Sequence, residues 1–156
     1  LQFQLLLIKQ EENTMSPKIE KWALAIRTHE GWAKGSRSYR NNNPGNFKRN
    51  PSGYRSIYGV VGIDEKGFAI FPSYSLGWLY LNNFLKLAAQ GKSNTYNAEG
   101  KRRFGVLSCA DLTVEQFFII YCEDDPLTPE NDPIVYAKVV AREIGCLIST
   151  KIKELL

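Results

Sequence analysis

The chain has 156 residues, of which 44% are hydrophobic and 23% are charged. This composition is typical of a folded globular protein and excludes a disordered, collagen-like or low-complexity chain. The length fits one domain, and no apolar run reaches the roughly 18 residues of a membrane-spanning helix. We therefore expect a single domain over residues 16–156. Residues 1–15 read as an appended or trimmed arm that docks as a strand or helix and carries no chemistry.

The charge of the chain is small, but it is unevenly distributed. The net charge is +4, and no Asp or Glu occurs between Gly31 and Ile63. The same stretch carries six cations, which are Lys34, Arg37, Arg40, Lys48, Arg49 and Arg55. This basic stretch is either a solvated loop or a face that attracts an anionic polymer. A nucleic-acid partner is disfavoured because the chain has no recognised nucleic-acid-binding motif.

Cysteine and histidine give little indication of metal or redox chemistry. Cys109, Cys122 and Cys146 are spaced in no zinc or CxxC pattern, so they are expected to be small buried residues. His29 is the only histidine. We therefore expect no cofactor and no metal.

The first confident element is a helix that opens at Ser16-Pro17 and ends at Gly31. Serine is a preferred N-cap, proline is favoured at the first helical position, and glycine commonly follows the last turn. Helical spacing places four apolar residues on one face, namely Ile19, Trp22, Ala23 and Ile26. Glu30 falls in the last turn, at the edge of that face.

The next segments are predicted to form a loop and a hairpin. Residues 35–53 are rich in Gly, Ser, Asn and Pro and read as an extended loop. Residues 54–63 and 68–71 then read as two strands around a turn at 64–67.

The rest of the chain is predicted to be largely helical. An amphipathic helix is expected over about 74–90, followed by a polar, mixed stretch at 92–105. Thr113 and Gln116 form a capping box before an apolar central helix. Further helices are expected from Asp132-Pro133 to Gly145 and over 147–156. The predicted fold class is α+β, mostly α-helical, with a small antiparallel hairpin after the first helix.

Glu30 is the strongest candidate for a catalytic residue. It is expected against Trp32 and Trp22, where desolvation and the carboxyl end of the helix both raise the pKa of a carboxyl. A carboxylic acid that stays protonated near neutral pH can protonate a leaving oxygen. The alternative is an exposed helix-end glutamate without a role.

The second feature is the sequence Arg-Asn-Asn-Asn-Pro-Gly-Asn at residues 40–46. Four asparagines around Pro-Gly form either an ordinary turn or a wall of hydrogen bonds. Asparagine side chains can fix a loop by binding backbone groups, and they can equally bind sugar hydroxyl or acetamido groups. The residues alone leave both possibilities open.

These features together resemble the lysozyme-like superfamily. The pattern is a helix ending in Glu-Gly-Trp at 30–32, the RNNNPGN loop, a hairpin ending Gly-Phe-Ala-Ile-Phe at 67–71, then Ser73 and Gly77 opening a helix. The resemblance is to lytic-transglycosylase-like endolysins and muramidases that carry an RNNNPGN loop, and it covers residues 17–146. Many lytic transglycosylases have serine after the glutamate, where this chain has Gly31.

The resemblance implies roles for particular residues. Glu30 would be the catalytic acid, and Asn43 and Asn46 would shape the loop that faces it across a cleft. Further substrate-binding residues would be Tyr58, Phe71, Ser73, Tyr121 and Tyr136. The residues themselves leave open whether Tyr39, Tyr54, Tyr58 and Tyr74 stack on sugars or fill the hairpin core.

A second catalytic carboxyl is expected to come from Asp64. Retaining glycosidases hold their two carboxyls about 5 Å apart and inverting ones about 6.5–9.5 Å apart. Asp64 is the first acidic residue after Glu30, although it lies in the predicted hairpin turn. If it does not reach the cleft, Glu30 must act as both acid and base, and the product would be an anhydro-sugar.

The resulting hypothesis is a monomeric muramidase that cuts the β-1,4 bond between N-acetylmuramic acid and N-acetylglucosamine in peptidoglycan glycan strands. It would act in the cell envelope, in the periplasm or outside the cell, or be delivered to the wall. We expect no signal peptide in residues 1–15. The alternatives are a chitin-directed glycosidase on the same fold and a non-catalytic glycan-binding module.

Overall fold

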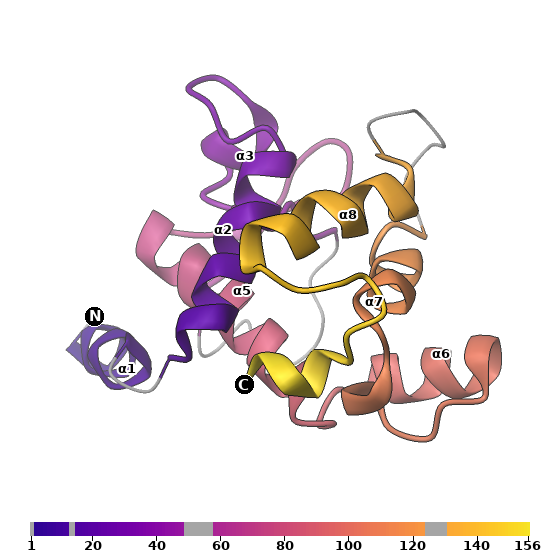
Figure 1. The fold of residues 1–156 in the computed structure, drawn as a ribbon. Coiled ribbons are helices and arrows are strands. Elements are labelled where there is room, and N and C mark those ends of the chain that lie inside the picture. The colour runs from indigo at the N-terminus through magenta and orange to yellow at the C-terminus, as the bar shows by residue number, and fades with distance from the viewer. Residues whose placement is uncertain (1, 13–14, 49–57, 124–130) are drawn as a thin grey trace. The chain divides into compact units, whose positions relative to one another are not determined.

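The computed structural model describes residues 2–12, 15–48, 58–123 and 131–156. The described chain is mostly helical and carries one small antiparallel sheet of two strands (Figure 1). This confirms a mostly helical chain with a small hairpin after the helix that precedes Glu30. The N-terminal arm is itself a helix.

The elements follow one another along the chain in an order close to the predicted one. They are α1 (Gln2–Glu12), α2 (Pro17–His29), α3 (Arg37–Arg40), β1 (Gly62–Ile63), β2 (Ala69–Ile70), α5 (Tyr74–Ala89), α6 (Asn94–Phe104), the 3₁₀ turn η1 (Cys109–Asp111), α7 (Val114–Tyr121), α8 (Pro133–Ile144) and the 3₁₀ turn η3 (Ile152–Leu155).

The residues group into two compact units. The first unit comprises residues 1–15 and 26–83, and the second comprises residues 16–25 and 84–156. The boundaries fall inside α2 and α5, so each of these helices contributes residues to both units. The candidate residues Glu30, Asn43, Asn46 and Asp64 all belong to the first unit.

Helix α2 has the predicted ends and the predicted buried face. It begins at Pro17 and ends at His29, and Gly31 follows with a left-handed φ of +73°. All four predicted face residues are buried, with exposed fractions of 1% or less for Ile19, Trp22, Ala23 and Ile26. Burial of this stripe, rather than intrinsic propensity, stabilises a helix of 13 residues.

Two helices lie where the sequence predicted no helix, one within the predicted loop at 35–53 and one within the polar, mixed stretch at 92–105. Helix α3 is a short turn whose N-cap, Ser36, accepts a hydrogen bond from the Tyr39 backbone. Helix α6 begins after the N-cap Ser93 and ends at Gly105, which has a left-handed φ of 66°. Its buried residues are Tyr96 and Gly100. Because this buried face is narrow, the sequence shows no apolar periodicity that would predict the helix. Its two capping residues, Ser93 and Gly105, are of the types preferred at helix ends.

The hairpin strands are shorter than predicted. Strands β1 and β2 have two residues each and pair antiparallel, with Gly62 opposite Ile70 and Ile63 opposite Ala69. Residues 54–57 of the predicted first strand lie outside the described residues. The inner face of the hairpin packs into a core cluster formed by Tyr58, Val60, Ala69, Phe71 and Leu79.

The second unit is built around α7, whose N-terminal capping box is present as predicted. Phe117 of this helix meets Trp22 edge-on, at 4.7 Å between ring centroids. Helix α8 packs against α7 (Figure 1). The rings of Phe118 and Tyr136 stack there at 4.4 Å between centroids. Asp132 caps α8 by accepting hydrogen bonds from the backbone of its first turn.

The prediction of a helix over 147–156 is wrong, because that segment pairs with the start of α7. The N–H groups of Val114 and Glu115 donate to the carbonyl oxygens of Thr150 and Ile148, each at 3.0 Å. The first N–H groups of a helix have no partner within it, so a neighbouring segment that supplies carbonyls is favoured there. Helical structure is confined to η3, at Ile152–Leu155.

Cys109, Cys122 and Cys146 are free thiols. Cys109 and Cys122 are buried as predicted, whereas Cys146 is only partly buried. Burial raises the pKa of the Cys109 thiol, which keeps that side chain protonated and unreactive.

Gly77 provides a test of the packing in the first unit. A Cβ added at this position of α5 would overlap the carbonyl oxygen of Asn42 and lie 3.1 Å from Cδ of Pro44. We expect G77A to lower the free energy of unfolding by about 1–3 kcal/mol or more, since the neighbour is backbone. G62A is the matched control because its Cβ meets nothing within 4 Å, and it should change stability by less than about 0.5 kcal/mol. Equal losses of stability in urea unfolding would contradict this packing.

Candidate functional site

The asparagine-rich segment, residues 41–46, directly follows α3 in the first unit. Asn41 and Asn43 have exposed fractions of only 6% and 0%. Asn42 and Asn46 both adopt left-handed backbone conformations with φ of 50°. Asparagine is one of the few side chains that tolerate this region, so the backbone favours this residue type at these two positions.

Asn43 attaches the segment to strand β2. Its Nδ2 donates to the carbonyl oxygens of both Phe47 and Ala69, at 3.0 Å each, and its Oδ1 accepts from the Phe47 backbone at 3.0 Å. The Ala69 N–H in turn donates to the Phe47 carbonyl at 2.9 Å. The Asn43 amide is fully buried and used on backbone groups, so it shapes the loop from within and does not reach a ligand.

The neighbouring asparagines continue the same pattern. The Phe71 N–H donates to the Asn41 carbonyl at 2.8 Å, and the Phe71 carbonyl accepts from Nδ2 of Asn42 at 3.2 Å. On the other edge of the hairpin, the Ile70 carbonyl accepts from the Val61 N–H. Alternate residues of the chain around β2 therefore bind β1 and the asparagine-rich segment, which covers this edge as a third strand would.

Asn46 meets Glu30 at the far end of the segment. Its Nδ2 donates to Oε2 of Glu30 at 3.4 Å, and Glu30 is partly buried. Oδ1 of Asn46 is buried and has no hydrogen-bond partner among the described residues. Because an amide carries both a donor and an acceptor, Asn46 can bind ionised Glu30 through Nδ2 or, after an amide flip, protonated Glu30 through Oδ1. The structure thus brings together two residues that the sequence had paired across a cleft.

The end of α2 fixes where Glu30 and Trp32 lie. The Glu30 N–H still donates to the Ile26 carbonyl at 2.9 Å, so its backbone completes the last helical turn. The chain then reverses at Gly31, and the Trp32 N–H returns to the Arg27 carbonyl at 3.2 Å. This is the hydrogen bond of a glycine-terminated helix end. It places Trp32 beside the same turn that carries Glu30, whereas Trp22 lies in the second unit.

Asp64 is held in the hairpin turn by a dense set of donors. Oδ2 accepts from Arg37 and Asn41, each at 2.9 Å, and Oδ1 accepts from the backbone of Lys66 and Phe68. Burial alone would raise the pKa of this carboxyl, but these hydrogen bonds and the Arg37 charge outweigh it and lower the pKa. Asp64 therefore ties the turn to α3 and to the asparagine-rich segment.

The other predicted substrate-binding residues of the first unit, Tyr58, Phe71 and Ser73, make contacts that stabilise the fold. Tyr58 and Phe71 are 6% and 1% exposed and belong to the core cluster, so their rings fill the interior of the unit. Oγ of Ser73 accepts from the Leu76 N–H at 3.3 Å, at the start of α5. A loop residue before a helix and inward-facing hairpin residues have these structural roles in many folds.

Tyr121 and Tyr136, the remaining two predicted substrate-binding residues, belong to the second unit. Tyr136 is 1% exposed and stacks on Phe118. Tyr121 is partly buried and stacks on Phe117 at 5.7 Å. Both rings are part of the aromatic packing between α7 and α8.

Sequence reasoning left the roles of Tyr39 and Tyr74 open and missed that their rings form a group with Trp32 and Trp78. The Trp32 ring centroid lies 5.1 Å from that of Tyr39 and 5.1 Å from that of Tyr74. Trp78 stacks on Tyr74 at 6.1 Å, and Nη1 of Arg27 donates to the Tyr74 hydroxyl at 2.6 Å. The signal was present, because Tyr74 and Trp78 are four residues apart and so share one face of α5.

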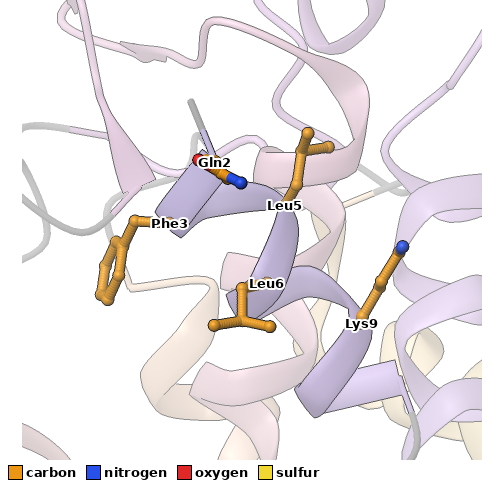
Figure 2. A pocket seen from close by; sticks show the side chains of 5 residues that line it. All are labelled: Gln2, Phe3, Leu5, Leu6 and Lys9. Carbon is orange, nitrogen blue, oxygen red and sulfur yellow. The ribbon is translucent and has the colours of Figure 1, made fainter.

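A pocket of about 490 Å³ lies on α1 and is lined by Gln2, Phe3, Leu5, Leu6 and Lys9 (Figure 2). Its wall is mainly apolar, and the side chains that line it include no acid, so it lacks a group for acid catalysis. Phe3 and Leu6 are strongly exposed, with exposed fractions of 66% and 65%.

No cluster of potential metal ligands occurs within the described parts of the chain. None of the described helices is long and apolar enough to cross a membrane. Comparisons with protein-family models, curated proteins and solved structures found no match.

The role of Asp64 can be tested through the pH dependence of stability. A carboxyl whose pKa is lowered by folding stabilises the protein above its unfolded pKa, about 4, and this contribution is lost as the pH falls through the folded pKa. We expect D64N to lower the free energy of unfolding by about 1–3 kcal/mol at pH 7 and by much less at pH 2–3.

The control for this measurement is E65Q. The Glu65 side chain is 71% exposed and lies 3.5 Å from Arg37, so its replacement should change stability by less than about 0.5 kcal/mol. Urea unfolding at both pH values gives the comparison. A D64N deficit that is the same at pH 7 and at pH 2–3 would show that the charge of Asp64 does not stabilise the turn.

Proposed function

We propose that this chain is a peptidoglycan-cleaving muramidase of lysozyme-like fold, a lysozyme or a lytic transglycosylase, with Glu30 as its general acid. The observation that carries the proposal is the contact between Glu30 and Asn46, which joins the end of α2 to the RNNNPGN segment. Glu30 is partly buried, which suits a carboxyl that must exchange a proton with a substrate.

In this mechanism Glu30 gives its proton to the glycosidic oxygen as the bond from that oxygen to C1 of the N-acetylmuramic acid breaks. The ionised Glu30 then takes a proton from the nucleophile that attacks C1. A water molecule gives a hydrolysed end, and the 6-hydroxyl of the same sugar gives an anhydro end. Positioned acid–base catalysis of this kind contributes about 10²–10⁴-fold to the rate.

The contacts of Asp64 favour Glu30 acting alone in both proton transfers. An aspartate that already accepts from Arg37, Asn41 and two backbone N–H groups has few lone pairs left to orient a water. Asp64 then supports the site by holding the asparagine-rich segment against the hairpin. A base role for Asp64 remains the competing assignment.

The charges of the first unit suit an anionic wall polymer. Lys34 and Arg40 are exposed, and no acidic residue occurs between Gly31 and Ile63. Site and charge together favour the cell wall as the place of action. The aromatic group around Trp32 fits a second candidate function, that of a glycan-binding module without catalysis. A chitin-directed glycosidase would use the same acid on an uncharged polymer.

The test of the enzymatic proposal is E30Q. Glutamine keeps the size and the hydrogen bonds of the side chain but cannot donate a proton as an acid. We expect the rate of clearing of purified cell walls to fall by about 10²-fold or more, with unchanged circular dichroism. E20Q, on an exposed glutamate of the same helix, is the matched control and should clear walls at the wild-type rate.

Two other results would change the assignment. If E30Q clears walls as fast as the wild type, Glu30 is not the acid. If D64N, assayed where it is fully folded, loses as much activity as E30Q, then Asp64 is the base. Wall binding by the wild type without any release of new sugar ends would favour the binding module.

A further inference from the structure

The aromatic group beside Glu30 has an arrangement that core packing does not require. Many aromatic rings of the chain are buried, among them Trp22, Phe71 and Phe117 at 1% exposure or less. Tyr39, by contrast, is 43% exposed. Trp32, Tyr74 and Trp78 are all only partly buried. A set of neighbouring rings left in contact with solvent is costly unless it meets a partner.

Each ring of this group contacts the next one. Centroids are 5.1 Å apart from Tyr39 to Trp32, 5.1 Å from Trp32 to Tyr74 and 6.1 Å from Tyr74 to Trp78. Each step is comparable to the size of one pyranose ring. We call Trp32, Tyr39, Tyr74 and Trp78 the aromatic platform.

Arg27 fixes one half of this platform. Its Nη1 donates to the Tyr74 hydroxyl at 2.6 Å, and its guanidinium lies 5.9 Å from the Tyr74 ring centroid and 5.5 Å from that of Trp78. The guanidinium therefore holds both rings through a hydrogen bond and cation–π contacts. Rings that are fixed before binding lose less conformational freedom when a ligand arrives.

The platform belongs to the same helix end as the proposed catalytic acid. Trp32 is two residues after Glu30, a separation of at most about 7 Å along the chain. The backbone bond from Trp32 to Arg27 holds that short connection against α2. The backbone of Trp32 therefore lies next to that of Glu30, so the platform begins at the helix end that carries the proposed acid.

We propose that the aromatic platform is a carbohydrate-binding subsite that stacks against the apolar faces of successive N-acetylated sugars. Pyranoses present C–H groups on their faces and hydroxyl and acetamido groups on their rims. Flat rings with polar edges, such as Trp and Tyr, match both parts of this surface. The inference rests on the proposed function for its ligand, and it adds the side chains that hold the glycan.

The experiment measures binding in the E30Q background, so that the ligand is not consumed. The probes are N-acetylglucosamine tetramer and soluble, uncross-linked peptidoglycan glycan strands, followed by calorimetry and by tryptophan fluorescence. Adding W32A should weaken binding about tenfold, which is the typical loss for one aromatic contact. W32F keeps a flat ring, so we expect a loss of no more than about threefold.

F3A is the matched control, because Phe3 is an exposed aromatic residue on α1 that is not part of the platform. It should leave the dissociation constant unchanged. Equal binding by W32A and its parent overturns the proposal, as does an equal loss in F3A. A single-stranded oligonucleotide is tested as well. If it binds more tightly than both glycans, and W32A weakens that binding, the assignment to sugars is overturned.

The two proposals fail separately. If walls are not cleared but W32A weakens glycan binding, the platform stands and the chain is a binding module. If walls are cleared through Glu30 but W32A binds glycan as well as its parent does, the enzyme assignment stands and the platform is wrong.

Discussion

The backbone N–H and carbonyl groups on the outer edge of strand β2 need hydrogen-bond partners, and in this molecule asparagine side-chain amides bind the carbonyls. Ala69 and Phe71 each present an N–H and a carbonyl group away from β1. Asn43 and Asn42 supply the donors for the carbonyls, and the backbone oxygens of Phe47 and Asn41 accept from the N–H groups. A two-residue strand with one partner would be marginal. The asparagines therefore stabilise the hairpin, and the hairpin in turn holds the asparagines in position.

That constraint determines what the segment can offer to a ligand. Three of its four asparagines are used internally, on Asp64, on β2 and on the loop itself. Asn46 alone is directed at Glu30. Asn41, Asn42 and Asn43 thus hold the loop in place as a scaffold, and Asn46 connects this scaffold to the proposed acid, Glu30. Gly77 permits the scaffold to pack against α5, since any side chain there would strike the Asn42 carbonyl.

The sequence predicted the parts of the structure that have a strong local code. Proline, capping residues and terminal glycines located α2, α7 and α8, and helical periodicity located α5. Helix α6 was missed because its exposed polar surface hides a narrow buried face. The segment after 147 was misread because its conformation depends on pairing with α7, and local propensity contains no information on such pairing.

In the candidate site, too, local sequence patterns predicted some features, whereas those that depend on long-range packing were missed. Position in a helix and in a motif was enough to single out Glu30 and Asn46. It was not enough to separate partly exposed rings from core rings: Tyr58 and Phe71, which were predicted to bind substrate, are buried, and the partly buried Trp78 was overlooked. Burial of a ring depends on which segments pack over it, and hydrophobicity does not encode this.

The central claim is that Glu30 transfers a proton to the glycosidic oxygen of peptidoglycan. Mass spectrometry of the fragments released from purified walls tests it most directly, because hydrolysed and anhydro ends differ by one water molecule. The account predicts new N-acetylmuramic acid ends of one of these two kinds with the wild type, and none with E30Q. Fragments with new N-acetylglucosamine reducing ends, or the same new reducing or anhydro ends from both proteins, would contradict it.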